Sequence, residues 1–310
     1  MKAIGLVALL LGVGLAQQGQ QPRFSTAVEM VRLEVDVSNE QGTILGLSSR
    51  DFEVTDNGRR QNVSVDELID TPLDLAVVVQ PLASIAQIAP GQLALISRAM
   101  TAFEELVEER DRVSLMVASA PPTQRRLLEA GPVKFDETAL QGRTDAAVFD
   151  AMVIALASIA EPTPGRRRAL LAFTNGADFR STTSFDRLTA LARRLGPAFV
   201  VVGAPVPIRE DMNAVLVTTM GRQLSDVAIA TAFGTVFPIS LRALARDSGG
   251  VAVNLGDGNP KELMEQALRR LRTRYEVSYP LPPGKGWHEV GVKVNRRGAR
   301  VAVRPGYWVD

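Results

Sequence analysis

The chain has 310 residues, 46% of them hydrophobic and 22% charged, which is typical of a folded globular protein and excludes a disordered or collagen-like chain. The formal net charge is +1, so the charge balance gives no indication of nucleic-acid binding. Because Cys is absent and His288 is the single histidine, disulfides, thiol nucleophiles and cysteine-ligated zinc are excluded, and the sequence predicts a protein that is not an enzyme.

Residues 1–16 have the pattern of an export signal. Lys2 precedes an uncharged run at 3–15, and Gly14 and Ala16 are small residues of the kind that a cleavage site requires. The run is shorter than the roughly 20 residues of a membrane-spanning helix, so cleavage is favoured over an uncleaved amino-terminal anchor. We therefore expect a mature chain with no membrane span, located in the periplasm or outside the cell.

Residues 17–71 begin with a polar stretch and continue as β structure. Apolar and polar residues alternate at 31–37, which is the period of a half-buried strand. Residues 52–54 and 63–65 lie on either side of the turn Asp56-Asn57-Gly58, and this arrangement predicts a hairpin.

In residues 72–274 continuous apolar runs alternate with amphipathic segments. The pattern predicts strands at 75–79, 113–118, 169–174, 198–202 and 251–255, and helices at 92–110, 145–160, 185–195, 241–247 and 260–274. Such an alternation is typical of an α/β fold with a doubly wound, mostly parallel sheet, whose ligands bind in the crevice at the carboxyl ends of the strands. Residues 204–237 do not fit the alternation and are interpreted as an inserted loop.

Residues 275–310 return to the two-residue period of β-strands. Each terminal β segment alone would expose sheet edges and an apolar face. We therefore predict that 17–71 and 275–310 together form one small β-sandwich into which the α/β domain of 72–274 is inserted. Two independent β appendages are the alternative.

Six segments in a fixed order resemble secreted bacterial proteins of the acidobacterial type that are related to the von Willebrand factor type A (VWA) domain. The segments are GLSSRDFEVTDNG at 46–58, DLAVVV at 74–79, GRTDAAVFD at 142–150, TNGAD at 174–178, YEVSY at 275–279 and RPGY at 304–307. The resemblance extends over nearly the whole mature chain. It implies a VWA-type α/β core and a role in adhesion, assembly or protein–protein interaction.

The resemblance also implies a metal-ion-dependent adhesion site, which uses a DxSxS motif, a Thr and a later Asp to hold a hard divalent cation. The matching positions in this chain are Gln80, Leu82, Ser84, Thr144 and Asn175. Amides thus replace both carboxylates, and an apolar side chain replaces one hydroxyl. Because no anionic ligand offsets the cost of dehydrating the ion, we predict a degenerate site that holds no metal and no other cofactor.

Two alternatives concern this site. Asp145 or Asp178 could act as a replacement ligand, which would make the chain a Mg²⁺-dependent adhesion protein. The favoured interpretation is that Asp145 caps the helix that begins there and that Asp178 is solvated. In that case Gln80, Ser84, Thr144 and Asn175, with Asp178 beside them, form a polar patch that either binds a protein partner without metal or is a vestige of the metal site.

Three further features have structural interpretations. His288 is expected to be structural or solvent-facing, Arg166-Arg167-Arg168 to be a solvated loop, and Tyr307-Trp308 to pack against the β-sandwich rather than anchor a partner. The sequence therefore predicts an exported protein–protein interaction module that uses the carboxyl-end crevice. A hydrolase and a structural subunit that interacts through the β-sandwich are the alternatives.

Overall fold

A computed structural model describes residues 29–309 except 89, 142–144, 177, 179, 204–205, 208–234 and 237–238. The expected export signal, Thr144 and most of the expected 204–237 insert therefore lie outside the described residues. Among the helices that the structure does describe, none is long and apolar enough to cross a membrane.

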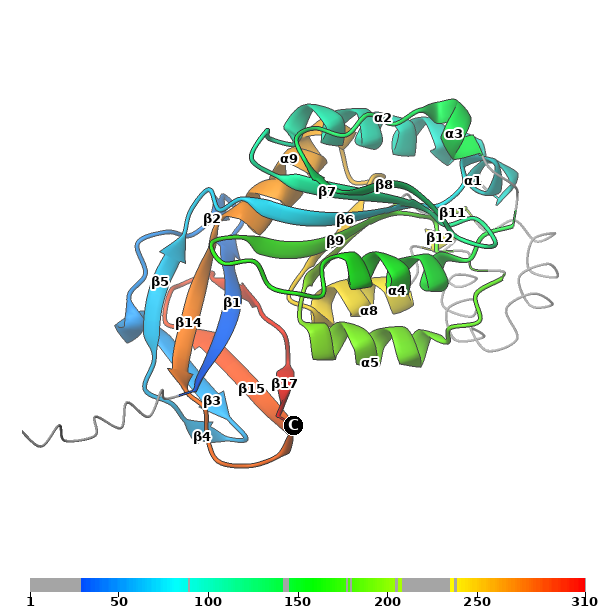
Figure 1. The fold of residues 1–310 in the computed structure, drawn as a ribbon. Coiled ribbons are helices and arrows are strands. Elements are labelled where there is room, and N and C mark those ends of the chain that lie inside the picture. The colour runs from blue at the N-terminus through cyan, green and yellow to red at the C-terminus, as the bar shows by residue number, and fades with distance from the viewer. Residues whose placement is uncertain are drawn as a thin grey trace, which may run out of the picture.

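Six strands form a central sheet in the spatial order β13-β10-β9-β6-β7-β8 (Figure 1). They are β6 (Leu73–Val79), β7 (Arg112–Val117), β8 (Thr123–Ala130), β9 (Arg167–Phe173), β10 (Ala198–Gly203) and β13 (Val251–Asn254). All neighbours pair in parallel except β8, which is antiparallel to β7 at one edge. Counted along the chain the order is 3-2-1-4-5-6, which is that of a doubly wound sheet. The predicted fold class is therefore confirmed.

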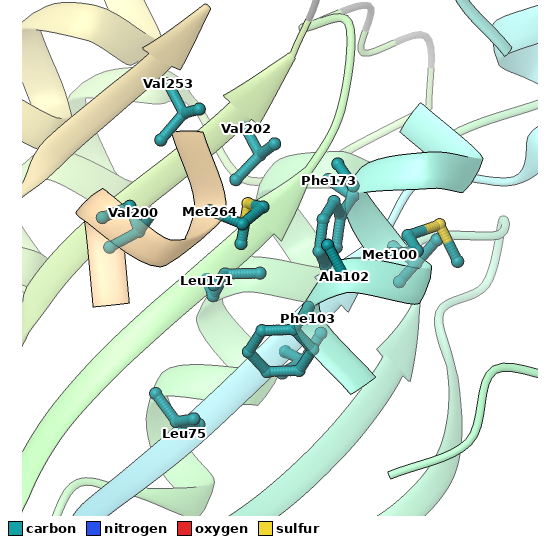
Figure 2. Close-up of a cluster of buried hydrophobic side chains, with 14 of the residues drawn as sticks. Leu75, Met100, Ala102, Phe103, Leu171, Phe173, Val200, Val202, Val253 and Met264 are labelled. Carbon is teal, nitrogen blue, oxygen red and sulfur yellow. The ribbon is translucent and has the colours of Figure 1, made fainter. Parts of the chain in front are cut away.

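Helices cover both faces of this sheet (Figure 1). One face carries α1 (Leu82–Ile88), α2 (Pro90–Leu106), α3 (Glu137–Gln141) and α9 (Pro260–Arg272), and the other carries α4 (Val148–Ser158), α5 (Phe185–Leu195) and α8 (Ile239–Asp247). Every residue of β6 is buried, and successive side chains enter the two cores alternately, with Val77 in the first and Val78 in the second. In the first core, Phe103 of α2 packs edge-on against Phe173 of β9 (Figure 2).

Strands from the two chain ends interleave in a β-sandwich. One sheet contains β1 (Met30–Asn39), β2 (Gly42–Thr43), β5 (Ser64–Leu68), β14 (Arg274–Pro280) and β16 (Arg300–Ala302). The other contains β3 (Phe52–Asp56), β4 (Arg59–Arg60), β15 (Gly286–Val294) and β17 (Gly306–Val309). Apolar residues of both sheets meet in one core, so the α/β unit is inserted between the two halves of the sandwich. The short elements η1 (Ser49–Asp51), β11 (Val206–Pro207) and β12 (Thr235–Val236) complete the described structure.

One local prediction is wrong in part, and some elements were not predicted. The hairpin at 52–65 ends after β4, because β5 crosses to the other sheet, where Val65 lies opposite Val277 of β14. A two-residue period is the same in both sheets of a sandwich, so it does not identify the partner strand. Helices α1 and α3 and strand β8 were not predicted. Strand β8 lacks a continuous apolar run because it is a largely polar edge strand that leaves Leu127 exposed.

The run Arg166-Arg167-Arg168 is not a solvated loop, which corrects the prediction. Its side chains lie at the amino end of the central sheet, where the α/β unit meets the sandwich. Arg166 Nε is 2.6 Å from Asp74 Oδ1, and Arg167, only 5% exposed, forms an ion pair with Glu34 of β1. Sequence alone did not indicate this, because the carboxylates come from strands far away in the chain.

Candidate functional site

Strands β6 and β9 bring Gln80 beside the segment 174–176. Val79 and Phe173 are register partners at the carboxyl ends of the two parallel strands, and the Gln80 backbone N–H donates to the Phe173 carbonyl oxygen at 2.9 Å. Because parallel strands end at the same edge of a sheet, the residues that follow β6 and β9 meet there. This is the edge of the sheet at which the sequence pattern predicts a binding crevice.

The Gln80 side chain is the centre of a buried hydrogen-bond network. Its Oε1 accepts hydrogen bonds from Thr174 Oγ1 at 2.6 Å and from the Asn175 backbone N–H at 3.1 Å. Its Nε2 donates to Ser84 Oγ at 3.0 Å, and both Gln80 and Ser84 are fully buried. A backbone N–H can only donate, so it defines which end of the Gln80 amide is the oxygen.

This set of donors and acceptors does not fit a hard divalent cation. Gln80 Oε1 already accepts two hydrogen bonds, and the Leu82 side chain is buried in the hydrophobic core. Mg²⁺ requires an octahedron of oxygen ligands with anionic charge among them. Within the described part of the chain, no group of three or more His, Cys, Asp and Glu side chains could hold a metal ion.

The two candidate replacement ligands have other partners, and both expectations about them are wrong. Helix α4 begins at Val148 rather than at Asp145, because Ala146 first forms a β-bridge with Ser119. Asp145 instead forms an ion pair with Arg180 at 3.5 Å. Asp178 is half-buried, not solvated.

Asp178 supports the start of α4 from a neighbouring loop. Its Oδ1 accepts hydrogen bonds from the backbone N–H groups of Val148 at 3.3 Å and Ser181 at 3.2 Å. Burial raises the pKa of Asp178 and outweighs these hydrogen bonds, which act in the opposite direction. Asp178 thus supplies the start of α4 with the acceptor that the N-cap residue Ala147 lacks.

Two residues of this edge were missed as site residues, although both lie in segments that carry the resemblance. Thr174 joins the network twice, since its Oγ1 donates to Gln80 and accepts from the Gly176 backbone N–H at 2.9 Å. Asp150 of α4 accepts from the backbone N–H groups of Thr182 and Thr183 and so holds the loop that follows β9. A polar residue directly after a buried strand was the available signal for Thr174.

Millimolar Mg²⁺ should leave the melting temperature of the protein unchanged, because no anionic ligand set offsets dehydration of the ion. A variant that combines Gln80→Asp, Leu82→Ser and Asn175→Asp restores the acidic pattern, and Mg²⁺ should raise its melting temperature. An ion at 100 times its Kd stabilises a folded protein by about 2.7 kcal/mol. Thermal melts with and without EDTA measure both effects. A Mg²⁺-dependent rise in the unmodified protein contradicts the prediction.

No family model and no curated protein matches the sequence. Similar solved structures include an aerotolerance-related membrane protein from Bacteroides fragilis, with 14% identity, a TM-score of 0.44 and coverage of 64% of this chain and 98% of that one. A von Willebrand factor type A protein from Catenulispora acidiphila is 10% identical, with a TM-score of 0.40 and coverage of 93% and 76%.

A third similar structure is proximal thread matrix protein 1 from the mussel byssus, determined with a zinc-occupied metal-ion-dependent adhesion site. It is 12% identical, with a TM-score of 0.44, and the alignment covers 69% of this chain and 49% of that one. The present chain thus spans about half the length of that protein.

Proposed function

We propose that the protein is an exported interaction module of the VWA type that binds a protein partner at its carboxyl-end crevice without a metal ion. The observation that carries the proposal is the Gln80 network. Gln80 stands at a position that the resemblance assigns to a cation ligand, but its side chain accepts a hydrogen bond from Thr174 and donates one to Ser84. In the proposed unit, residues 1–16 are removed, 72–274 form the binding domain, and 17–71 with 275–310 form its supporting sandwich.

Burial divides the proposed site into positioning and contacting residues. Gln80 and Ser84 are fully buried, so their role is to hold the loops after β6 and β9 in one arrangement. Asn175 is only 5% exposed and belongs with these buried residues, so contact with the partner is left to the half-buried Asp178 and to the exposed Arg180 at the rim. Thr144, the remaining candidate, lies outside the described residues. A surface that is already ordered loses less conformational entropy when the partner binds.

The position of His288 supports a binding role over a hydrolytic one. The side chain is 3% exposed in the β-sandwich, and its Nδ1 lies 2.8 Å from Asp56 Oδ1. It is therefore structural and not solvent-facing. A histidine acting as a general base would have to lie in the crevice within hydrogen-bond reach of a nucleophile.

Capture of partners by immobilised residues 17–310, with EDTA in one arm and Mg²⁺ in the other, tests the proposal. We expect the same partner in both arms. Arg180→Glu, which changes a charge at the crevice rim, should reduce capture, whereas Arg300→Glu on the sandwich strand β16 should not. Release of the partner by EDTA would instead support the alternative of Mg²⁺-dependent adhesion through Asp145 or Asp178.

A further inference from the structure

The only two tryptophans of the chain lie side by side on the outer face of the β-sandwich. Trp287 of β15 and Trp308 of β17 are register partners, and they are 36% and 55% exposed. The end of α5 lies next to β17 (Figure 1), and a cavity of about 460 Å³ separates these elements. We call this cavity the tryptophan groove; it is lined by Ala190, Arg193, Arg194, Trp287 and Trp308.

One wall of the tryptophan groove is held rigidly. A Cβ atom on Gly306 would lie 2.4 Å from Cζ2 of Trp287, so glycine at this position lets the indole lie against the strand backbone. On the α5 side, the Arg193 guanidinium carbon is 5.8 Å from the Trp287 ring centroid, within cation–π range. Arg193 is itself held by an ion pair with Asp247 at 3.2 Å. Little side-chain entropy is therefore lost when a ligand binds here.

The composition of the groove indicates the chemistry of its occupant. Its lining contains two arginines and no acidic residue, and Asp247, which pairs with Arg193, is shared with Arg246 at 3.0 Å. The groove therefore keeps an excess of positive charge and complements a negatively charged ligand. Tryptophan and arginine are the residue types that dominate binding energy at protein interfaces. Trp308, 55% exposed, presents most of the apolar indole surface, since the Arg193 guanidinium lies over the Trp287 ring.

We propose that the tryptophan groove binds an extended, proline-containing acidic segment of a partner protein. Proline rings pack on indole faces, and a polyproline II segment is already ordered before binding, as in other aromatic-lined grooves. Acidic side chains of the segment pair with Arg193 and Arg194. The groove lies on the β-sandwich side of the molecule, away from the Gln80 crevice, so the proposal does not depend on the function assigned to that crevice.

Tryptophan fluorescence tests the proposal directly, because both tryptophans of the chain line the groove. The probe is a peptide, capped at both ends, in which Pro-Pro-Asp is repeated three times. We expect a saturable change in emission, weakened about tenfold or more by Trp308→Ala and by Arg194→Glu. The control variant Arg300→Glu should bind as the unmodified protein does. Unchanged melting temperatures ensure that the variants are folded.

Matched probes define the results that overturn the proposal. Peptides in which Lys replaces Asp, or Gly replaces Pro, should bind about tenfold more weakly or worse. The proposal fails if the acidic proline peptide gives no saturable change, or if the lysine peptide binds equally well. It also fails if an uncharged glucose hexasaccharide alone produces the response, since the groove would then be a glycan site.

Discussion

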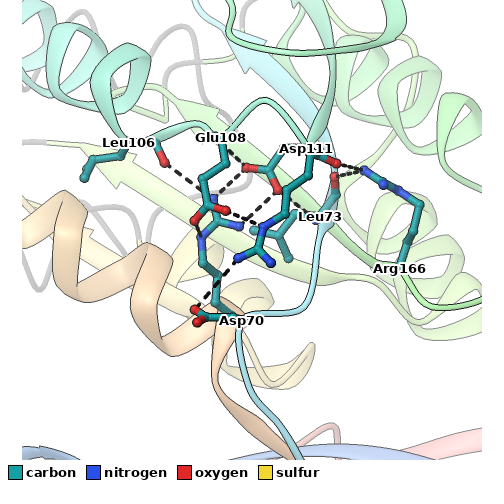
Figure 3. Close-up of polar contacts among 8 residues, drawn as sticks. Asp70, Leu73, Leu106, Glu108, Asp111 and Arg166 are labelled. Carbon is teal, nitrogen blue, oxygen red and sulfur yellow. Dashed lines mark hydrogen bonds and ion pairs between the residues drawn. The ribbon is translucent and has the colours of Figure 1, made fainter.

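Replacement of Asp111 by Ala should lower the free energy of unfolding by about 3–5 kcal/mol, the cost of removing one partner from a buried ion pair. The Asp111 side chain is fully buried, and its Oδ1 and Oδ2 are 3.0 and 2.6 Å from the two terminal nitrogens of Arg272 (Figure 3). It also accepts from the backbone N–H groups of Leu73 and Glu108, both at 2.9 Å. Loss of the carboxylate removes the acceptor of both backbone N–H groups and leaves the buried Arg272 with only Glu108 and the Leu106 carbonyl oxygen as partners.

Urea denaturation measures the effect, and Asp70→Ala is the matched control. Asp70 also forms an ion pair in this region, with Arg110 at 3.9 Å, but its side chain is 70% exposed. Exposed pairs contribute little, so the control should unfold almost as the unmodified protein does. Equal midpoints for the two variants would show that the Asp111 network does not join β6 to α9.

The same carboxylate predicts a loss of stability in acid. Burial acts to raise the pKa of Asp111, but the hydrogen bonds from Arg272 and from the Glu108 and Leu73 backbones outweigh it and lower the pKa. A group whose folded pKa lies below its unfolded value of about 3.9 stabilises the fold above that pH and loses this effect as the pH falls through the folded pKa. Asp111→Ala should therefore show a weaker dependence of stability on acid pH.

Replacement of Asp56 by Ala should destabilise the β-sandwich by a similar amount, about 3–5 kcal/mol. Asp56 is 2% exposed at the end of β3, and its Oδ2 accepts hydrogen bonds from Tyr279 at 2.9 Å and Tyr307 at 2.6 Å. Its Oδ1 is 2.8 Å from His288 Nδ1. The substitution leaves three buried polar side chains without this shared partner, and each such loss is costly.

Denaturant unfolding measures this loss, with Glu53→Ala on the same strand as the control. Glu53 is only half-buried and points away from the sandwich core, so its removal should change stability little. If Asp56→Ala were no more destabilising than Glu53→Ala, the hydrogen bonds of Asp56 would contribute nothing to the sandwich.

Alkaline titration gives a second measurement of this core. Burial raises the pKa of Tyr275 to about 12, and burial together with Asp56 raises the pKa values of Tyr279 and Tyr307 as well. Because the folded values exceed the unfolded value of about 10, the stabilisation is complete below that pH and is lost as the pH rises. Folded protein should show no tyrosine ionisation near pH 10, whereas in Asp56→Ala the onset for Tyr307 should move to lower pH.

The order of most strands and helices, with the exception of α1, α3 and β8, followed from local patterns. A strand buried on both faces needs a continuous apolar run, such as 75–79, and a helix needs an apolar stripe, so both are visible in a few consecutive residues. The predicted helix at 185–195 has the bounds of α5, where Ser184 caps the start and Gly196 ends it. Neither terminal β segment could bury its apolar face alone, and this led to the prediction that both form one sandwich.

Pairing between distant residues did not follow from the sequence. The patterns did not reveal that β5 leaves the expected hairpin, that Arg167 reaches Glu34, or that Tyr307 is buried while Trp308 is exposed. The expectation that both aromatic residues pack against the sandwich is therefore wrong for Trp308. Neighbours on a strand point to opposite faces, and only the assembled sheet determines which face is covered.

At the crevice, the sequence by itself determined which atoms are present: amides at Gln80 and Asn175 and an apolar side chain at Leu82, none of which carries negative charge. Only the tertiary structure decided what those atoms do. Gln80 receives its hydrogen bonds from Thr174 and from Asn175, 94 and 95 residues further along the chain, while Asp178 supports α4. Covalent structure defines the donors and acceptors, but their partners depend on contacts that exist only after the sheet has formed.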